Sequence, residues 1–396
     1  MEELKKKQNS RIFQLSLITS GLSIRVLGDV YIGEIILSIF VLSGLLLGMK
    51  FQVPSQTRTL VKLLIIWFFA NLISSFVRQK SISLTLIAIF TVIITGICLI
   101  GILHFFQTYR NERTKFILIF GIGKILGAII DPSPYVGELP WKFGFGEPII
   151  ITALALIIWT KSNSVTYFSL LILAFISLTN EARTLSFLVL FTLLCFVVSN
   201  INFFRKHLNS LVLIVLVAPL LYLGYLQLAL SGQLGSNEIK RAQVLTNSDL
   251  GPLVARKEFL FSVDAFMKSP AIGYGFDPKV SNKLILNGYQ SLANLGLRVE
   301  ILNDEVLPIH SFVMGALIQG GLFAGLYWMY VLVLGIRALK IVLMAKKFHI
   351  PIVAYASIAL VNRIIFSPFG ASERLIVDIF IAILLFMNEP NRRNND

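Results

Sequence analysis

Six basic side chains lie beside or within long apolar runs of the sequence, where an ionisable group is costly and needs a chemical reason. They are Arg25, Arg183, Arg256, His310, Arg363 and Arg374. A guanidinium group binds two phosphate oxygens at once, so arginines in such places indicate a bound anion. An imidazole exchanges a proton near neutral pH, which suits a general base. The set therefore predicts a site that holds an anion and removes a proton.

The plainer alternative for each arginine is an ion pair or a side chain that reaches up to the membrane surface. Arg374 follows Glu373 directly, and Arg183 comes two residues after Glu181. Arg363 has no acidic neighbour in the sequence, so it is the hardest of the six to explain in this way.

His310 opens the apolar stretch Pro308–Ile336. The positive end of a helix dipole disfavours imidazolium, so the ring at a helix start stays neutral and can act as a base. Asp304 and Glu305 are near enough in sequence to orient the ring or to replace it as the base. The alternative is a polar histidine that caps a helix at the membrane surface.

Two of the arginines belong to predicted helix starts. Arg183 follows a short turn, and Arg256 lies at the beginning of a helix in the longest polar segment. Free backbone N–H groups at a helix start favour an anion. The sequence holds no HExxH motif and no His/Asp cluster, so we expect no metal and no cofactor.

The composition is that of a polytopic membrane protein. Of the 396 residues, 56% are hydrophobic and 14% are charged, against about 45–50% and about 25% in soluble domains. The net charge of +14 is expected to reflect cytoplasmic loops that face anionic lipid, and not nucleic acid. Cys98 and Cys195 lie in apolar runs and predict no disulfide framework.

We predict an all-α bundle of about twelve membrane-spanning helices, each drawn from an apolar run of suitable length. The predicted ranges are about 11–28, 31–49, 60–77, 82–107, 115–130, 147–160, 164–180, 183–199, 208–230, 309–337, 349–366 and 371–387.

Lys and Arg residues on the short loops gather on one side of these helices, which places both termini in the cytoplasm. The basic N-terminus lacks a small-residue cleavage site and is expected to be a mature cytoplasmic end. The chain then divides into helices one to nine (1–230), a large outer loop (231–308) and helices ten to twelve with a cytoplasmic tail (309–396). No two-fold repeat is visible, which weighs against a transporter.

The outer loop contains a predicted amphipathic helix at about 252–268. Phe259, Val263, Phe266 and Met267 fall on one helical face, and Ser269-Pro270 follows as a stop signal. Two interpretations stay open: a helix that lies on the membrane surface or caps the bundle, and a lid over an outer site.

Three motifs give the chain a resemblance to the superfamily of O-antigen ligases and O-antigen polymerases, membrane glycosyltransferases of the bacterial envelope. They are His310-Ser311 followed by Gly320-Gly321-Leu322-Phe323-Ala324-Gly325, Arg256 followed by Pro270-Ala271-Ile272-Gly273-Tyr274-Gly275, and Ala182-Arg183-Thr184. The resemblance covers mainly residues 180–337. Ser311 stands where Asn is commoner and Ala182 where the superfamily has Ser, which leaves fine substrate contacts open.

The resemblance implies transfer of a glycan from an undecaprenyl-pyrophosphate-linked donor to a sugar hydroxyl of a glycan or lipid A core acceptor. The transfer would be inverting and metal-independent, at the periplasmic face of the bacterial inner membrane. His310 would be the catalytic base, and Arg183 and Arg256 would bind the pyrophosphate. Residues with a supporting role would be Arg363, Arg374, Asp304, Glu305 and Ser311.

Two other functions stay open. A transporter or flippase of lipid-linked sugars would need charges deep in the membrane, for which Arg363 and Lys124 are the candidates. A structural or assembly protein would have no use for His310. The motifs also do not separate a ligase from a polymerase.

Overall fold

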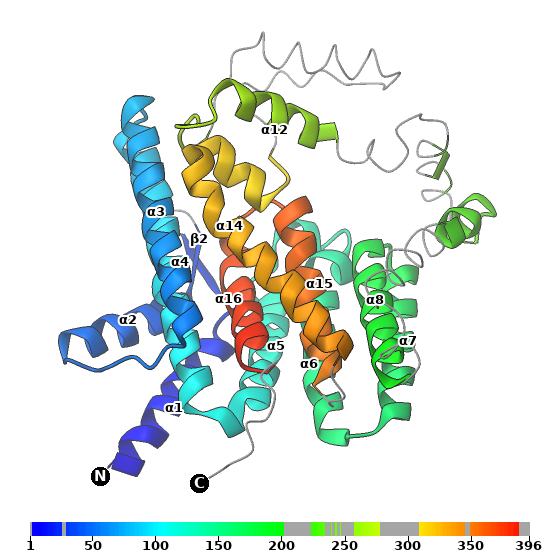
Figure 1. Ribbon diagram of the computed structural model, residues 1–396. Helices are drawn as coiled ribbons and strands as arrows, with labels where there is room; N and C mark the ends of the chain where they lie inside the picture. Colours follow the sequence, from blue (N-terminus) through cyan, green and yellow to red (C-terminus); the bar gives the residue numbers. More distant parts are fainter. Residues whose placement is uncertain are drawn as a thin grey trace.

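The computed structural model describes residues 2–25, 29–201, 223–233, 239, 242–243, 246, 257–277, 309–344 and 349–387. These residues form a helical bundle with one small β-hairpin (Figure 1). The expectation of an all-α fold is confirmed at this level.

The main helices follow the apolar runs of the sequence. Their bounds are α1 (Glu2–Ile18), α2 (Ile32–Leu46), α3 (Ser55–Val77), α4 (Ile82–Thr108), α5 (Arg113–Ile130), α6 (Gly146–Thr160), α7 (Asn163–Thr179), α8 (Arg183–Asn200), α12 (Lys257–Lys268), α14 (Phe312–Met344), α15 (Ile350–Phe366) and α16 (Ala371–Phe386). Short helical turns occupy Arg110–Glu112, Pro134–Val136 and Trp141–Phe145.

Five helices of the described chain are long and apolar enough to cross a membrane. They are Thr57–Val77, Ile82–Thr108, Trp141–Thr160, Arg183–Asn200 and Phe312–Met344. Shorter apolar helices cover Ile32–Leu46, Asn163–Thr179 and Ile350–Phe366. The chain therefore has the helices of a membrane protein, while the count of twelve spans stays a prediction.

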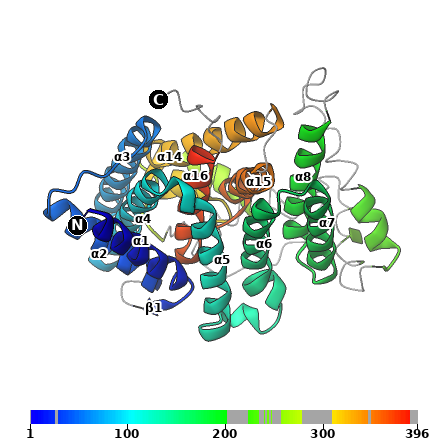
Figure 2. The ribbon, with the colours of Figure 1, turned by 90° about the horizontal axis from the view of Figure 1, so that it is seen from below.

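Helix α16 is the centre of the bundle. Every residue from Arg374 to Phe386 is buried, and neighbouring helices α4, α14 and α15 surround it (Figures 1 and 2). A helix that is apolar on all faces must be covered on all sides by protein or lipid, and here protein does most of this. Asp378 is the one acidic residue in this fully buried stretch.

The first predicted span, 11–28, is wrong in its second half. Helix α1 ends at Ile18, and β1 (Ser23–Arg25) pairs antiparallel with β2 (Asp29–Tyr31). Gly21 lies so close to α5 that a Cβ atom there would be 2.6 Å from the Gly123 carbonyl oxygen. This contact turns the chain, and Asp131 then accepts hydrogen bonds from the Ser23 amide and hydroxyl.

Helix α14 is broken at Gly321, whose backbone has φ +71° and ψ −167°. Glycine tolerates this conformation because it has no Cβ. The Leu322 amide cannot reach the preceding turn of its own helix and donates instead to the Pro270 carbonyl oxygen at 2.8 Å. The break is thus bonded to a turn that precedes Gly321 by about fifty residues in the chain. Non-helical backbone inside a membrane protein requires such partners.

The two ends of the bundle differ. Helix α1 begins and α16 ends toward one end, whereas α3 ends and α14 begins at the end that carries α12 (Figure 1). The α12 end therefore corresponds to the side predicted to face outward.

Candidate functional site

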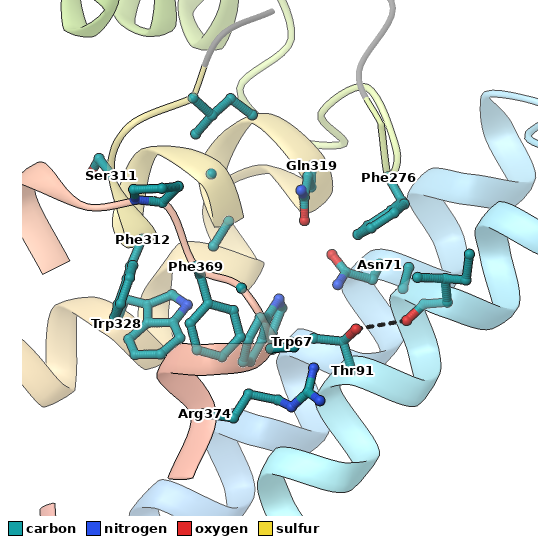
Figure 3. A pocket seen from close by; sticks show the side chains of 18 of the residues that line it. Trp67, Asn71, Thr91, Phe276, Ser311, Phe312, Gln319, Trp328, Phe369 and Arg374 are labelled. Carbon is teal, nitrogen blue, oxygen red and sulfur yellow. Dashed lines mark hydrogen bonds between the residues drawn. The ribbon is translucent and has the colours of Figure 1, made fainter. Parts of the chain in front are cut away.

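A cavity of about 370 Å³ lies near the α12 end of the bundle, between α3, α4, α14 and the residues that lead into α16. We call it the aromatic cavity because Trp67, Phe276, Phe312, Trp328 and Phe369 line it (Figure 3). Its polar lining residues are Asp29, Asn71, Thr91, Ser311, Gln319 and Arg374.

The aromatic rings hold one another in fixed, inclined positions. Trp328 is 4.8 Å from Phe369 and 5.5 Å from Trp67 between ring centroids, with interplanar angles of 61° and 67°. Phe312 contacts Trp328 at 4.9 Å and Phe369 at 5.1 Å. Edge-to-face pairs of this kind are favourable and keep side chains in place, so the cavity has rigid walls.

Three polar atoms of these walls are buried without a hydrogen-bond partner among the described residues. They are the indole nitrogens of Trp67 and Trp328 and the Oδ1 atom of Asn71. Figure 3 shows these side chains and that of Gln319 gathered around the same space. A buried polar atom without a partner costs about 1–3 kcal/mol, which points to a missing partner.

The loop segment after α12 forms part of the same site. The Tyr274 amide donates to the Ile318 carbonyl oxygen at 2.7 Å, and the Gly275 amide to that of Gln319 at 2.9 Å. These bonds use carbonyl groups that the break of α14 leaves free. Phe276, the next residue, then lines the aromatic cavity.

Arg78 at the end of α3 fixes this segment from the other side. Its Nε atom donates to the Gly273 carbonyl oxygen at 2.8 Å, and its Nη2 atom to the Ser269 hydroxyl at 2.6 Å. Its guanidinium also lies 5.1 Å from the Tyr274 ring centroid.

Helix α12 covers Lys257–Lys268 of the predicted loop helix, and residues 252–256 lie outside the described part. Phe276, eight residues after the end of this helix, lines the aromatic cavity, which agrees with the interpretation of the segment as a lid.

A second cavity of about 510 Å³ adjoins the first, since Asp29 and Ala371 line both. We call it the charged cavity. Its charged lining residues are Asp29, Lys124, Asp131, Lys142, Glu147 and Glu373. Lys124 lies 4.4 Å from the Tyr31 ring centroid and 3.4 Å from the Ser372 carbonyl oxygen.

Buried ion pairs surround the two cavities. Arg374 donates from Nε and Nη2 to the two carboxylate oxygens of Glu34, at 2.7 and 2.8 Å, and from Nη2 to the Asp29 carbonyl oxygen at 2.8 Å. Two-pronged geometry of this kind is the strongest form of such a pair. Glu34 is fully buried and also accepts from the Tyr31 amide.

Arg363 pairs with both Glu147 and Glu373. Tyr355 donates to the other oxygen of Glu147 at 3.3 Å. The neighbour of Arg374 in the sequence, Glu373, thus serves Arg363, whereas Arg374 finds its partner 340 residues away. Both arginines therefore have carboxylate partners, as the ion-pair alternative expects.

Asp378 is fully buried on α16, and neither of its carboxylate oxygens has a hydrogen-bond partner among the described residues. A charged group in this position is costly unless it is paired or protonated. The Tyr327 hydroxyl is likewise buried without a partner in the described chain.

His310 lies just before α14 and is exposed. Its neighbours Ile309 and Ser311 line the aromatic cavity. Ser311 is buried, donates to the Ile364 carbonyl oxygen at 2.9 Å and accepts from the Met314 amide at 3.2 Å. Ser311 therefore caps α14 and ties its start to α15.

Arg183 is the first residue of α8 and contacts Tyr225. Its Nη1 atom donates to the tyrosine hydroxyl at 2.6 Å, and its guanidinium lies 5.6 Å from the ring centroid. It lines neither cavity. Arg256, Asp304, Glu305 and the side chain of Arg25 lie outside the described part of the chain. The convergence of His310, Arg183 and Arg256 stays a prediction.

The residues that build the aromatic cavity were missed in the sequence. Trp67, Trp328 and Phe369 come from three separate segments, so no local pattern joins them. Asn71 was the available signal, because an amide inside the apolar run 60–77 needs a partner. Among the described residues, no group of three or more His, Cys, Asp or Glu side chains is arranged to hold a metal ion.

Comparison of the chain with protein-family profiles, with curated proteins and with solved structures found no match.

Proposed function

We propose that the protein is a membrane glycosyltransferase of the O-antigen ligase or polymerase kind. It would move a glycan from undecaprenyl pyrophosphate to a sugar hydroxyl on a glycan or on lipid A core, in lipopolysaccharide or exopolysaccharide assembly. The observation that carries the proposal is the position of His310. It is exposed at the α12 end of the bundle, and the residues on both sides of it line a cavity.

The proposed setting is the bacterial inner membrane, crossed about twelve times with both termini in the cytoplasm. The loop 231–308 and the α12 end of the bundle would then face the periplasm, where lipid-linked glycans are joined. Charge on the short loops supports this orientation, and the location of α12 opposite the start of α1 agrees with it.

In the proposed reaction His310 takes the proton of the acceptor hydroxyl. The acceptor oxygen forms a bond to the anomeric carbon from the side opposite the leaving group, which inverts that centre. The bond between the anomeric carbon and the pyrophosphate oxygen breaks, and its electron pair leaves with the pyrophosphate. Arg183 and Arg256 would stabilise that charge, a term that is commonly the largest in catalysis. Arg363 and Arg374 would hold the helices in place through their carboxylate partners.

The test is His310→Ala in a strain that lacks the native copy, with the envelope glycan profiled on gels. We expect loss of long-chain glycan with unchanged protein level, because general base catalysis contributes about 10²- to 10⁴-fold. His349→Ala, at the opposite end of the bundle, is the control and should keep the glycan. Long-chain glycan from a normally expressed His310→Ala protein would contradict the proposal.

A second candidate is a transporter or flippase of lipid-linked sugars. Two features favour it, because transporters use both at their binding sites: the buried Asp378, which has no hydrogen-bond partner among the described residues, and the broken helix α14. It predicts that Asp378→Asn stops transport while His310→Ala does not. Lipid-linked glycan that accumulates on the cytoplasmic side in the deletion strain would support it over the enzyme.

A further inference from the structure

We propose that the aromatic cavity is a binding site for an uncharged saccharide. The inference rests on the proposed function, which supplies the saccharide: either the donor glycan or the acceptor. It adds a subsite formed by Trp67, Asn71, Trp328 and Phe369, none of which belongs to the predicted catalytic set.

The three polar atoms that lack a partner in the described part of the chain define what the occupant must offer. The indole N–H groups of Trp67 and Trp328 need acceptors, and Asn71 Oδ1 needs a donor. A sugar hydroxyl is both donor and acceptor, so neighbouring hydroxyls of one ring can serve all three atoms. A prenyl or acyl chain would serve none of them and would leave their desolvation cost in place.

The ring walls define the shape of the occupant. A pyranose ring has faces of C–H groups, and these carry small positive charges that suit the negative face of an aromatic ring. Trp67, Trp328 and Phe369 surround the space at steep mutual angles. The cavity, at about 370 Å³, lies near the lower end of the usual range of about 300–1,000 Å³ for ligand pockets. It therefore fits a short saccharide segment and not a polymer.

The charges argue that this segment is neutral. Arg374 is the one cationic residue in the described lining, and its Nε and Nη2 atoms already donate to Glu34 and Asp29. A phosphate would therefore compete with a buried two-pronged ion pair. Asp29, the one acidic residue in that lining, further disfavours an anion.

The site opens beside the proposed base. Ile309 and Ser311 line the cavity on either side of His310, and Phe276 of the docked loop segment lines it as well. A saccharide held there would have its end near the imidazole. The geometry thus makes the aromatic cavity a positioning site for one of the two sugars that react.

The test uses the tryptophans of the cavity as reporters. The chain has four tryptophans, so the double variant Trp141→Phe/Trp159→Phe leaves emission from Trp67 and Trp328 alone. The purified full-length protein is titrated with the neutral oligosaccharide that mild acid releases from the strain's own envelope polysaccharide. Inorganic pyrophosphate and undecaprenol are titrated in parallel as the anionic and apolar probes.

We expect a saturable change in emission with the oligosaccharide and none with pyrophosphate. Asn71→Leu should weaken oligosaccharide binding about tenfold, which corresponds to one lost hydrogen bond of about 1.4 kcal/mol. Asn163→Leu, an exposed residue at the opposite end of the bundle, is the matched control and should bind as the parent does. Saturation by undecaprenol alone, or binding that Asn71→Leu leaves unchanged, would overturn the inference.

The outcomes separate the two proposals. His310→Ala should abolish glycan transfer and keep oligosaccharide binding. If the unsubstituted protein binds the oligosaccharide but shows no transferase activity, the saccharide site stands and the proposed enzyme activity is contradicted. Transferase activity without oligosaccharide binding would do the reverse.

Discussion

The two adjoining cavities solve the same problem in opposite ways. Both place polar groups inside an apolar bundle, where each group must find a partner or carry a cost. In the charged cavity the lining groups have protein partners: the carboxylates of Glu147 and Glu373 pair with Arg363, and Lys124 donates to the Ser372 carbonyl oxygen. In the aromatic cavity the polar atoms of Trp67, Asn71 and Trp328 have no partner in the described chain.

This difference separates a framework from a candidate binding site. Ion pairs that satisfy each other fix the helices and leave little for a ligand to gain. Polar atoms that line a cavity without a hydrogen-bond partner favour a ligand, because binding would remove a desolvation cost that the folded protein already carries. The comparison yields stability predictions that differ in size and, in the last case, in sign.

The largest effect is expected from Arg374→Ala. It leaves the fully buried Glu34 without its cation, and breaking one side of a buried pair costs about 3–5 kcal/mol. The measurement is unfolding of the purified protein in mixed micelles with increasing denaturing detergent. The double variant Glu34→Gln/Arg374→Met removes both charges and should recover most of the loss. Equal destabilisation in the single and double variants would show that the loss of stability does not come from the unpaired charge of Glu34.

The next effect in size is expected at the break of α14, the helix that contributes Phe312 and Trp328 to the aromatic cavity. Gly321→Ala forces a side chain into a left-handed conformation, and its Cβ would lie 2.2 Å from the Ala271 carbonyl oxygen. We expect a loss of about 2 kcal/mol or more. Gly96→Ala is the matched control, since its Cβ meets only a Leu64 side-chain atom at 3.6 Å. A similarly small loss of stability in both variants would mean that α14 is not broken at Gly321.

A smaller effect is expected at Ser311. Ser311→Ala removes the cap of α14 and the hydrogen bond to Ile364, and a lost cap costs about 1 kcal/mol. His310→Ala, one residue earlier and exposed, should change stability by less than about 0.5 kcal/mol. The two neighbours should therefore separate stability from activity. A His310→Ala protein that unfolds as readily as Ser311→Ala would mean that the histidine is structural.

The smallest effect on stability should come from Asn71→Leu, with the opposite sign. The substitution removes a buried oxygen that has no hydrogen-bond partner in the described residues, and it keeps the size of the side chain. Replacing an unsatisfied polar group by an apolar one is close to neutral or stabilising by about 1 kcal/mol. The same detergent titration measures it. Clear destabilisation would mean that Asn71 is bonded within the protein, and the contrast between the cavities would fail.

The sequence predicted the helices better than their contacts. Apolar runs set the bounds of α4, α6 and α8 closely, because helices in a membrane must satisfy their own backbone. The hairpin after α1 was missed since the cause lies in α5, where Gly123 and Gly127 let Gly21 approach. A contact between segments a hundred residues apart leaves no periodic signal.

Of the residues predicted for the site, Arg374 and Ser311 line the aromatic cavity. His310, Arg183, Arg363 and Arg374 stand out because charge is rare in apolar runs. Their partners do not stand out, as the pairing of Arg374 with Glu34 shows. Gly321 is one of several glycines in its apolar run, and the φ angle that makes it a break accompanies hydrogen bonds to the docked segment, which no local pattern shows.

The bonds between the loop turn and α14 also bear on how the protein matures. An unbroken α14 would satisfy its own amides and could enter the bilayer as an ordinary helix. The break exchanges some of those bonds for bonds to Pro270, Tyr274 and Gly275, which precede α14 in the chain. Docking of the segment Pro270–Gly275 and the final shape of α14 are therefore coupled. Quality control that senses exposed backbone in the membrane would, by this logic, also detect a fault in that segment.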